Sequence, residues 1–146
     1  MPDTYSEKHI KSIITAGSVY YYHEKSINSV KQHNFIVINL DPSKDTIIFL
    51  VCSSSQTQRV KQLYRNCPAE TLAEITPIQY SGFSEKSIID CNTIFSKNIS
   101  EIARMLSKGK MQIKPVMDLR LVRKLRQGVI LSPLVTIEIK KLLSRS

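Results

Sequence analysis

Five short runs of β-branched, aromatic and other apolar residues follow one another through the first two thirds of the chain, separated by polar turns. The runs are residues 18–24, 33–40, 46–53, 71–80 and 87–95. Pro77 ends the strand in the fourth run, and Pro42 initiates the turn before the third. Closely spaced strands of this kind favour a small barrel or curled sheet over a parallel α/β fold.

The N-terminal and C-terminal parts show helical spacing instead. A short helix is expected over 3–15, with Asp3 or Thr4 as N-cap, with Ile10, Ile13 and Ile14 on one face, and with Gly17 closing it. Three more helices are expected near the C-terminus: one over Ile99–Leu106 closed by Gly109, one capped by Asp118 and closed by Gly128, and one from Pro133 to Leu143. The cationic segment QTQRVKQLYRN predicts a loop or one to two helical turns.

These elements predict a single domain over residues 1–146, mainly β with α. Its β core covers about 17–96 and its helical part about 97–146. A basic helix, a short turn and a second helix can also describe a helix-turn-helix DNA reader. The apolar residues Leu119, Val122, Leu125, Val129 and Ile130 favour helices that pack on the sheet instead.

Composition limits the class of protein. An apolar content of 42% and a charged content of 23% describe an ordinary globular chain. No segment approaches the roughly 18 continuous apolar residues of a membrane span, and the N-terminus lacks the apolar stretch of a signal peptide. The three cysteines, Cys52, Cys67 and Cys91, form no CxxC pair, and Cys52 and Cys91 are expected in the core. We therefore expect a cytoplasmic protein without a membrane partner.

The net charge of +9 favours a polyanionic partner, which can be nucleic acid, an acidic protein or an anionic membrane surface. A solubilising basic surface is the alternative. No Walker loop, Rossmann loop or HExxH motif occurs, and no histidine stands at ligand spacing from a cysteine. The sequence therefore predicts neither a metal nor a cofactor.

The third run ends in hydroxyls, amides and cations, which are the groups that hold phosphates and base edges. They are Ser53, Ser54, Ser55, Gln56, Arg59 and Lys61. His33 stands at the start of the second run. If the two strands pair, a histidine and a serine hydroxyl face one polyanionic substrate.

Structural roles compete with this interpretation. His33 can be a half-exposed strand-end residue, and Ser54 can satisfy backbone groups of a turn. Because three serines are adjacent, the role assigned to Ser54 can instead belong to Ser53 or Ser55. His23 can join the same site or lie solvated in a turn. Tyr20, Tyr21 and Tyr22 alternate across the sheet, so that some can stack unpaired bases while at least one packs in the core.

Four fragments in order resemble the MazF/PemK superfamily of bacterial toxin endoribonucleases. Gly17-Ser-Val-Tyr resembles the opening of the family's first strand. HNFIVIN (33–39) stands where the family has an Arg-Pro-apolar strand. IIFLVCSSSQTQRVK (47–61) resembles the strand that ends in Thr or Ser before Gln-x-Gln-[KR], and GFSEKSIIDCNTI (82–94) is similar to a later segment. The resemblance spans roughly Gly17 to Ser96.

The resemblance implies a small SH3-like barrel, dimeric, that cleaves single-stranded RNA without a metal and is neutralised by an antitoxin protein. It implies that Ser54 occupies the position of the family's catalytic Thr/Ser. The chain departs from the family at one important point, because His33 and Asn34 replace the catalytic arginine and the proline after it.

The expected chemistry assigns His33 as the base, because its unperturbed pKa lies near neutrality. Ser54 donates to the phosphate, and Arg59 or Lys61 neutralises its charge, with Ser53, Ser55 and Gln56 as further RNA contacts. The expected function is a metal-independent endoribonuclease, the toxin of a toxin–antitoxin pair. The alternatives are a non-catalytic RNA- or protein-binding module of the same fold and a DNA-binding regulator.

Overall fold

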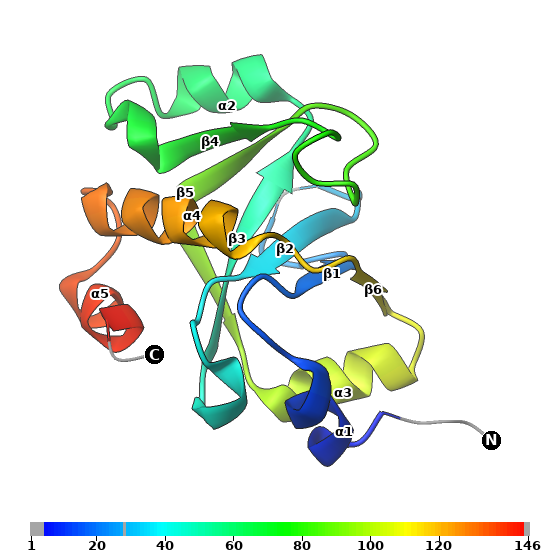
Figure 1. Ribbon diagram of the computed structural model, residues 1–146. Coiled ribbons are helices and arrows are strands. Elements are labelled where there is room, and N and C mark those ends of the chain that lie inside the picture. Colours follow the sequence, from blue (N-terminus) through cyan, green and yellow to red (C-terminus); the bar gives the residue numbers. More distant parts are fainter. Residues whose placement is uncertain (1–4, 28, 145–146) are drawn as a thin grey trace.

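A computed structural model describes residues 5–27 and 29–144 (Figure 1). Its centre is a six-stranded sheet in the order β4-β5-β3-β2-β1-β6, in which all neighbouring strands are antiparallel. The strands are β1 (Val19–Tyr22), β2 (His33–Val37), β3 (Ile48–Ser54), β4 (Leu72–Ile75), β5 (Ser87–Lys97) and β6 (Met111–Lys114). All five expected strands are present, and the fold is mixed α/β around an antiparallel sheet.

Two features differ from the expected core. Within the described residues β4 and β6 each pair on one side only, so the sheet is not closed into a barrel. The sequence does not predict β6, which makes the expectation of five strands wrong by one. β6 is an edge strand of four residues in which only Met111 is buried, so its alternation is too short to stand out.

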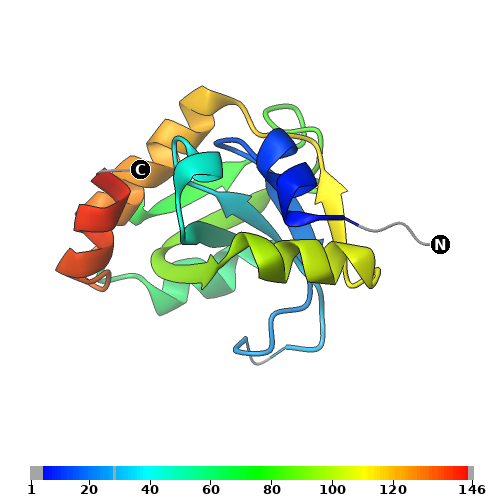
Figure 2. The same ribbon diagram turned by 90° about the horizontal axis from the view of Figure 1, so that it is seen from below.

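Helices cover both faces of the sheet (Figures 1 and 2). The "α3 face" carries α1 (Glu7–Ile13) and α3 (Ile99–Ser107), which share one apolar cluster with Tyr20, Phe35 and Leu50. The "α4 face" carries α4 (Leu119–Leu131) and α5 (Ile137–Ser144) over a second cluster that includes Val51 and Ile89. Successive residues of each strand alternate between these two faces.

The helix termini differ in detail from the expected ones. The side chain of Ser6 caps α1 by accepting a hydrogen bond from the amide of His9 at 3.0 Å, whereas Asp3 and Thr4 lie outside the described residues. Ile10 is fully buried but Ile13 is 42% exposed. α3 begins with a capping box between Asn98 and Glu101, as its apolar spacing predicts a helix there.

The sequence places the end of α4 at Gly128, and this is wrong because the helix continues to Leu131. A Cβ built on Gly128 would lie 2.5 Å from the carbonyl oxygen of Glu70. The glycine therefore permits a close approach between α4 and the chain before β4, and does not end the helix. α5 also begins later than expected, at Ile137 and not at Pro133.

The apolar face of α4 is narrower than the sequence suggests. Val122, Leu125 and Val129 are fully buried in the cluster of the α4 face, whereas Leu119 and Ile130 are 43% and 44% exposed. α4 therefore packs on the sheet through its apolar residues, as the sequence favours over a helix-turn-helix arrangement.

Strand direction gathers the expected site at one end of the sheet. β2 pairs with β3 through Phe35↔Cys52 and Ile36↔Val51. This pairing ends at Phe35 and Cys52, so His33 and Asn34 at the start of β2 and Ser53 and Ser54 at the end of β3 lie at the same end of the sheet. The helix α2 (Thr57–Leu63) follows directly, and the 3-10 turns η1 (Pro42–Lys44) and η2 (Ala69–Thr71) lie in other connections.

Candidate active site at the end of β2 and β3

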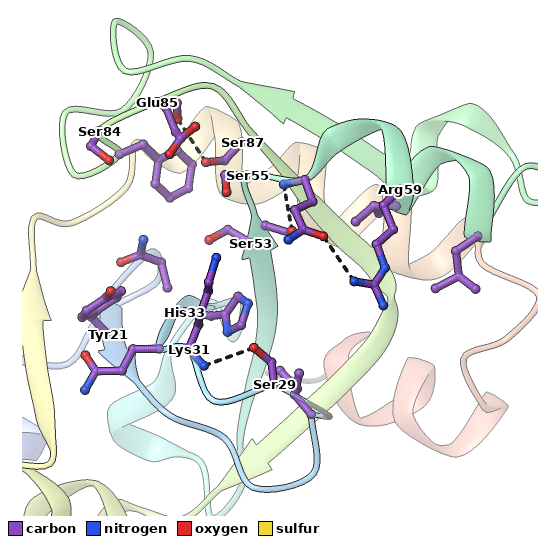
Figure 3. Close-up of a pocket in the computed structure, with 18 residues that line it drawn as sticks. Tyr21, Ser29, Lys31, His33, Ser53, Ser55, Arg59, Ser84, Glu85 and Ser87 are labelled. Atoms are coloured by element: carbon purple, nitrogen blue, oxygen red, sulfur yellow. Dashed lines mark hydrogen bonds between the residues drawn. The ribbon is translucent and has the colours of Figure 1, made fainter.

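A pocket of about 310 Å³, here called the strand-end pocket, opens where β2 begins and β3 ends (Figure 3). Six of the seven residues that the sequence assigns to the site line it. They are His33, Ser53, Ser54, Ser55, Gln56 and Arg59. The pocket therefore brings together a histidine, three hydroxyls, an amide and a cation from two neighbouring strands and the helix after them.

His33 is half-buried at the first position of β2, where it pairs with Tyr22 of β1. Burial lowers the pKa of its imidazole below the ordinary value, the positive charges of His23 and Lys31 act in the same direction, and the nearby backbone of Lys31 acts against them. Its Nδ1 atom is buried without a hydrogen-bond partner among the described residues. The ring is consequently neutral at pH 7, which is the form that can accept a proton.

The hydroxyl of Ser54 has a structural role in the turn after β3. Its Oγ accepts a hydrogen bond from the amide of Gln56 at 3.1 Å. The side-chain oxygen of Gln56 in turn accepts from Arg59 Nη1 at 3.3 Å. Since the Ser54 hydroxyl only accepts in this contact, its proton remains available to a bound phosphate.

Lys61 lies apart from the other expected residues. Its ammonium is 2.9 Å from Glu74 Oε2, and it does not line the strand-end pocket. Arg59, two positions earlier on α2, points to the pocket (Figure 3). Of the two cations that the sequence offers for neutralising a phosphate, the structure brings only Arg59 to the pocket.

The further residues that line the pocket include three that sequence reasoning does not assign to the site, Lys31, Asn34 and Glu85, and also Tyr21, which it names only as one of three tyrosines that can stack bases. The backbone amide of Lys31 donates to Ser29 Oγ at 3.1 Å, and its side chain extends beside His33 toward Ser53 (Figure 3). The position of Lys31 two residues before His33 is the one signal that could have found it. Asn34 is recognisable only as the replacement for the proline in the resemblance.

The three consecutive tyrosines divide between the faces. Tyr20 and Tyr22 are buried in the cluster of the α3 face, and Tyr22 stacks on Phe35 with ring centroids 4.2 Å apart. Tyr21 points the other way and lines the pocket. His23 does not line the pocket. Its Nε2 atom forms a hydrogen bond with the backbone carbonyl of Ser29 at 2.8 Å. Only one tyrosine is therefore placed to meet a ligand there.

Burial raises the pKa of the Cys52 and Cys91 thiols to about 12, with Asp90 acting in the same direction. These side chains stay protonated near neutral pH, which agrees with core residues and not with nucleophiles. All three cysteines are free. Among the described residues no group of three or more His, Cys, Asp or Glu could hold a metal, and no helix could cross a membrane.

The arrangement can bind a phosphodiester and move a proton. Lys31 and Arg59 supply positive charge, the serines supply hydroxyl donors, and His33 supplies a neutral base in one pocket.

Neither a protein-family model nor a curated protein matches this chain.

Proposed function

We propose that this protein is a metal-independent endoribonuclease that cleaves single-stranded RNA in the strand-end pocket. One observation carries the proposal: one pocket is lined by His33, whose lowered pKa favours the neutral ring, by the hydroxyl of Ser54 and by two cations, Lys31 and Arg59. A base, a hydroxyl donor and positive charge are what RNA needs for cleavage by its own 2′-hydroxyl.

In this reaction His33 takes the proton of the 2′-hydroxyl, and the oxygen attacks the adjacent phosphorus. Ser54 donates a hydrogen bond to the phosphorane oxygen as its charge grows, and Arg59 offsets that charge. The bond to the 5′ oxygen then breaks, and we assign its protonation to Lys31. The products are a 2′,3′-cyclic phosphate and a 5′-hydroxyl, so that protons and charges balance without another reactant.

The resemblance to the MazF/PemK superfamily extends this proposal. We propose the toxin of a toxin–antitoxin pair, cytoplasmic and homodimeric, whose antitoxin occupies the same pocket. The net charge of +9 suits both an RNA and an acidic antitoxin. An SH3-like barrel belongs to the same proposal. The register shift between Leu50 and Cys52, where β3 pairs with the eleven-residue β5, supports a bend of that kind.

The test is incubation of the purified protein with a long single-stranded RNA in chelator, after any co-purified antitoxin is removed. Wild type should cut at discrete sites and leave cyclic phosphate ends. His33→Ala should lower the rate by about 10²–10⁴-fold, the usual loss for a general base. Ser54→Ala should lower it by about 10²-fold, as for one donor to the charged intermediate.

Matched controls exist for His33 and for Arg59. His9 is an exposed histidine on α1 whose ring packs edge-on against Tyr5, so His9→Ala should leave cleavage unchanged. Lys61→Ala removes a cation of α2 that lies outside the pocket. It should lower the rate of RNA cleavage far less than Arg59→Ala does. Intact RNA in the presence of folded, antitoxin-free protein would refute the ribonuclease.

A second candidate is a non-catalytic RNA- or protein-binding module of the same fold. One observation favours it: His33 replaces the catalytic arginine of the resemblance. RNA binding without cleavage would support this module. The DNA-binding regulator is the weakest candidate, because the apolar face of α4 is occupied by the sheet.

A further inference from the structure

The strand-end pocket has a second wall, on the α4 face of the sheet, that the cleavage chemistry does not use. Tyr21 of β1 pairs with Asn34 of β2, and by strand alternation Ser53 of β3 belongs to the same row on this face. All three residues line the pocket. Because strand residues alternate, this row points away from His33 and Ser54, which belong to the other face.

Asn34 is the unusual member of this row. Its side-chain oxygen Oδ1 is buried and has no hydrogen-bond partner among the described residues. A buried carbonyl oxygen without a donor is costly, and such exceptions in native structures require an explanation. The terminal torsion of an asparagine is soft, so the amide can rotate and present its oxygen and nitrogen together to the pocket.

Tyr21 supplies a flat apolar surface beside this amide. Its ring is partly exposed, and the ammonium of Lys114 lies 5.6 Å from the ring centroid. Because Tyr21 also lines the pocket, its ring is available there to another planar group. An aromatic ring next to a hydrogen-bonding amide is the usual combination for an unpaired nucleobase in single-stranded RNA.

We propose that Tyr21 and Asn34 form a nucleobase subsite that selects adenine on the α4 side of the strand-end pocket, across the end of the sheet from His33 and Ser54. The base stacks on Tyr21, and the Asn34 amide accepts from its exocyclic amino group while donating to the adjacent ring nitrogen. Asparagine forms this bidentate pair with adenine in known nucleic-acid complexes. The proposal rests on the proposed function for the position of the phosphate, but the base contact is independent of cleavage.

The test measures binding of labelled 2′-O-methyl pentanucleotides of A, C, G and U, which lack the attacking hydroxyl and cannot be cleaved. Wild type should bind the A pentamer about tenfold more tightly than the others, within the range of one good bidentate contact. Asn34→Ala should remove the preference. Tyr21→Ala should weaken binding of all four, and Tyr21→Phe should restore it.

Gln112 provides the matched control, since it pairs with Tyr21 from β6 and is an exposed amide outside the pocket lining. Gln112→Ala should leave both affinity and preference unchanged. Equal binding of all four pentamers, or an A preference that survives Asn34→Ala, would overturn the subsite even if RNA is cleaved. An A preference lost in Asn34→Ala, with no cleavage of long RNA, would instead keep the subsite and refute the ribonuclease.

Discussion

Buried polar side chains are treated differently in two regions of this molecule. Beneath α4 and α5, Asn92, Thr71 and Ser132 form a closed network, here called the Asn92 network. Asn92 Nδ2 donates to Thr71 Oγ1 at 3.0 Å, and Ser132 Oγ donates to Asn92 Oδ1 at 2.7 Å. At the strand-end pocket, Asn34 Oδ1 and His33 Nδ1 are buried without partners among the described residues.

The two regions differ in whether their buried polar atoms have hydrogen-bond partners within the described residues. Native proteins satisfy nearly all buried polar groups, and the exceptions concentrate where a ligand or a reaction needs them. In the part of the chain that the structure describes, Tyr22 Oη is also buried without a partner, and Tyr22 is the register partner of His33. The unmatched atoms of residues 22, 33 and 34 therefore lie on adjoining positions of β1 and β2. The Asn92 network joins α4 to the sheet, whereas at the strand-end pocket His33 and Asn34 hold buried polar atoms without partners among the described residues.

The largest expected effect comes from breaking the Asn92 network. Asn92→Ala should lower the free energy of unfolding by about 3 kcal/mol, because it removes two buried hydrogen bonds at once: the buried Ser132 hydroxyl loses its acceptor and Thr71 Oγ1 loses its donor. Urea unfolding followed by circular dichroism measures the change. Asn66→Ala, at an exposed asparagine, should cost less than about 0.5 kcal/mol. A loss of under 1 kcal/mol for Asn92→Ala would mean that the network does not hold the helices.

The corresponding change at the pocket should leave the fold almost untouched. Asn34→Ala removes an amide whose oxygen has no partner, so the free energy of unfolding should shift by less than about 1 kcal/mol in either direction. The same urea experiment compares Asn34→Ala with Asn92→Ala directly. Equal destabilisation by the two substitutions would remove the distinction between the regions.

Sequence reasoning succeeds where local patterns decide the structure. β2, β3 and β5 are found because their apolar runs are long, and α3 because its apolar residues recur at helical spacing. It fails where tertiary contacts decide. Gly128 resembles a helix terminator, but the close approach of Glu70 makes it an interior residue of α4.

The candidate site follows the same division. Residues Ser53 to Arg59 are contiguous and polar, so the sequence identifies them together. Tyr21, Asn34 and Glu85 reach the pocket only through strand register and a loop, which no local pattern encodes. Lys61 stands about 200° from Arg59 around a helix. Because the segment 56–66 is not firmly predicted as helical, the sequence cannot separate the two cations.

The shifted pKa of His33 gives a smaller effect with a definite sign. Burial lowers its folded-state pKa below the ordinary value of about 6.5, so the unfolded chain binds more protons below that pH. The wild-type free energy of unfolding should therefore fall as pH drops below about 6.5. Over the same pH range the free energy of unfolding of His33→Gln should fall less. Urea titrations of both proteins from pH 8 to pH 5 measure this difference.

The rate profile provides an independent check on the same group. If His33 is the base, the acidic limb of cleavage against pH should lie below about 6.5, because the ring remains neutral in more acidic solution than a free histidine. Unfolding curves of wild type and His33→Gln that stay parallel at every pH would contradict the lowered pKa. They would also weaken the contrast between an unsatisfied pocket and a satisfied network.

The smallest effect concerns the two cations of α2, and it tests whether the pocket meets a phosphate at all. Each phosphate neutralised on a single strand contributes about 0.7 to the slope of log affinity against log salt. Arg59→Ala should lower that slope by about 0.7 for a 2′-O-methyl RNA, whereas Lys61→Ala should not change it, since Lys61 is paired with Glu74. Fluorescence anisotropy at salt concentrations from low to physiological measures both slopes. Equal losses in the two variants would show that the basic surface binds RNA diffusely, and that the strand-end pocket has no privileged phosphate.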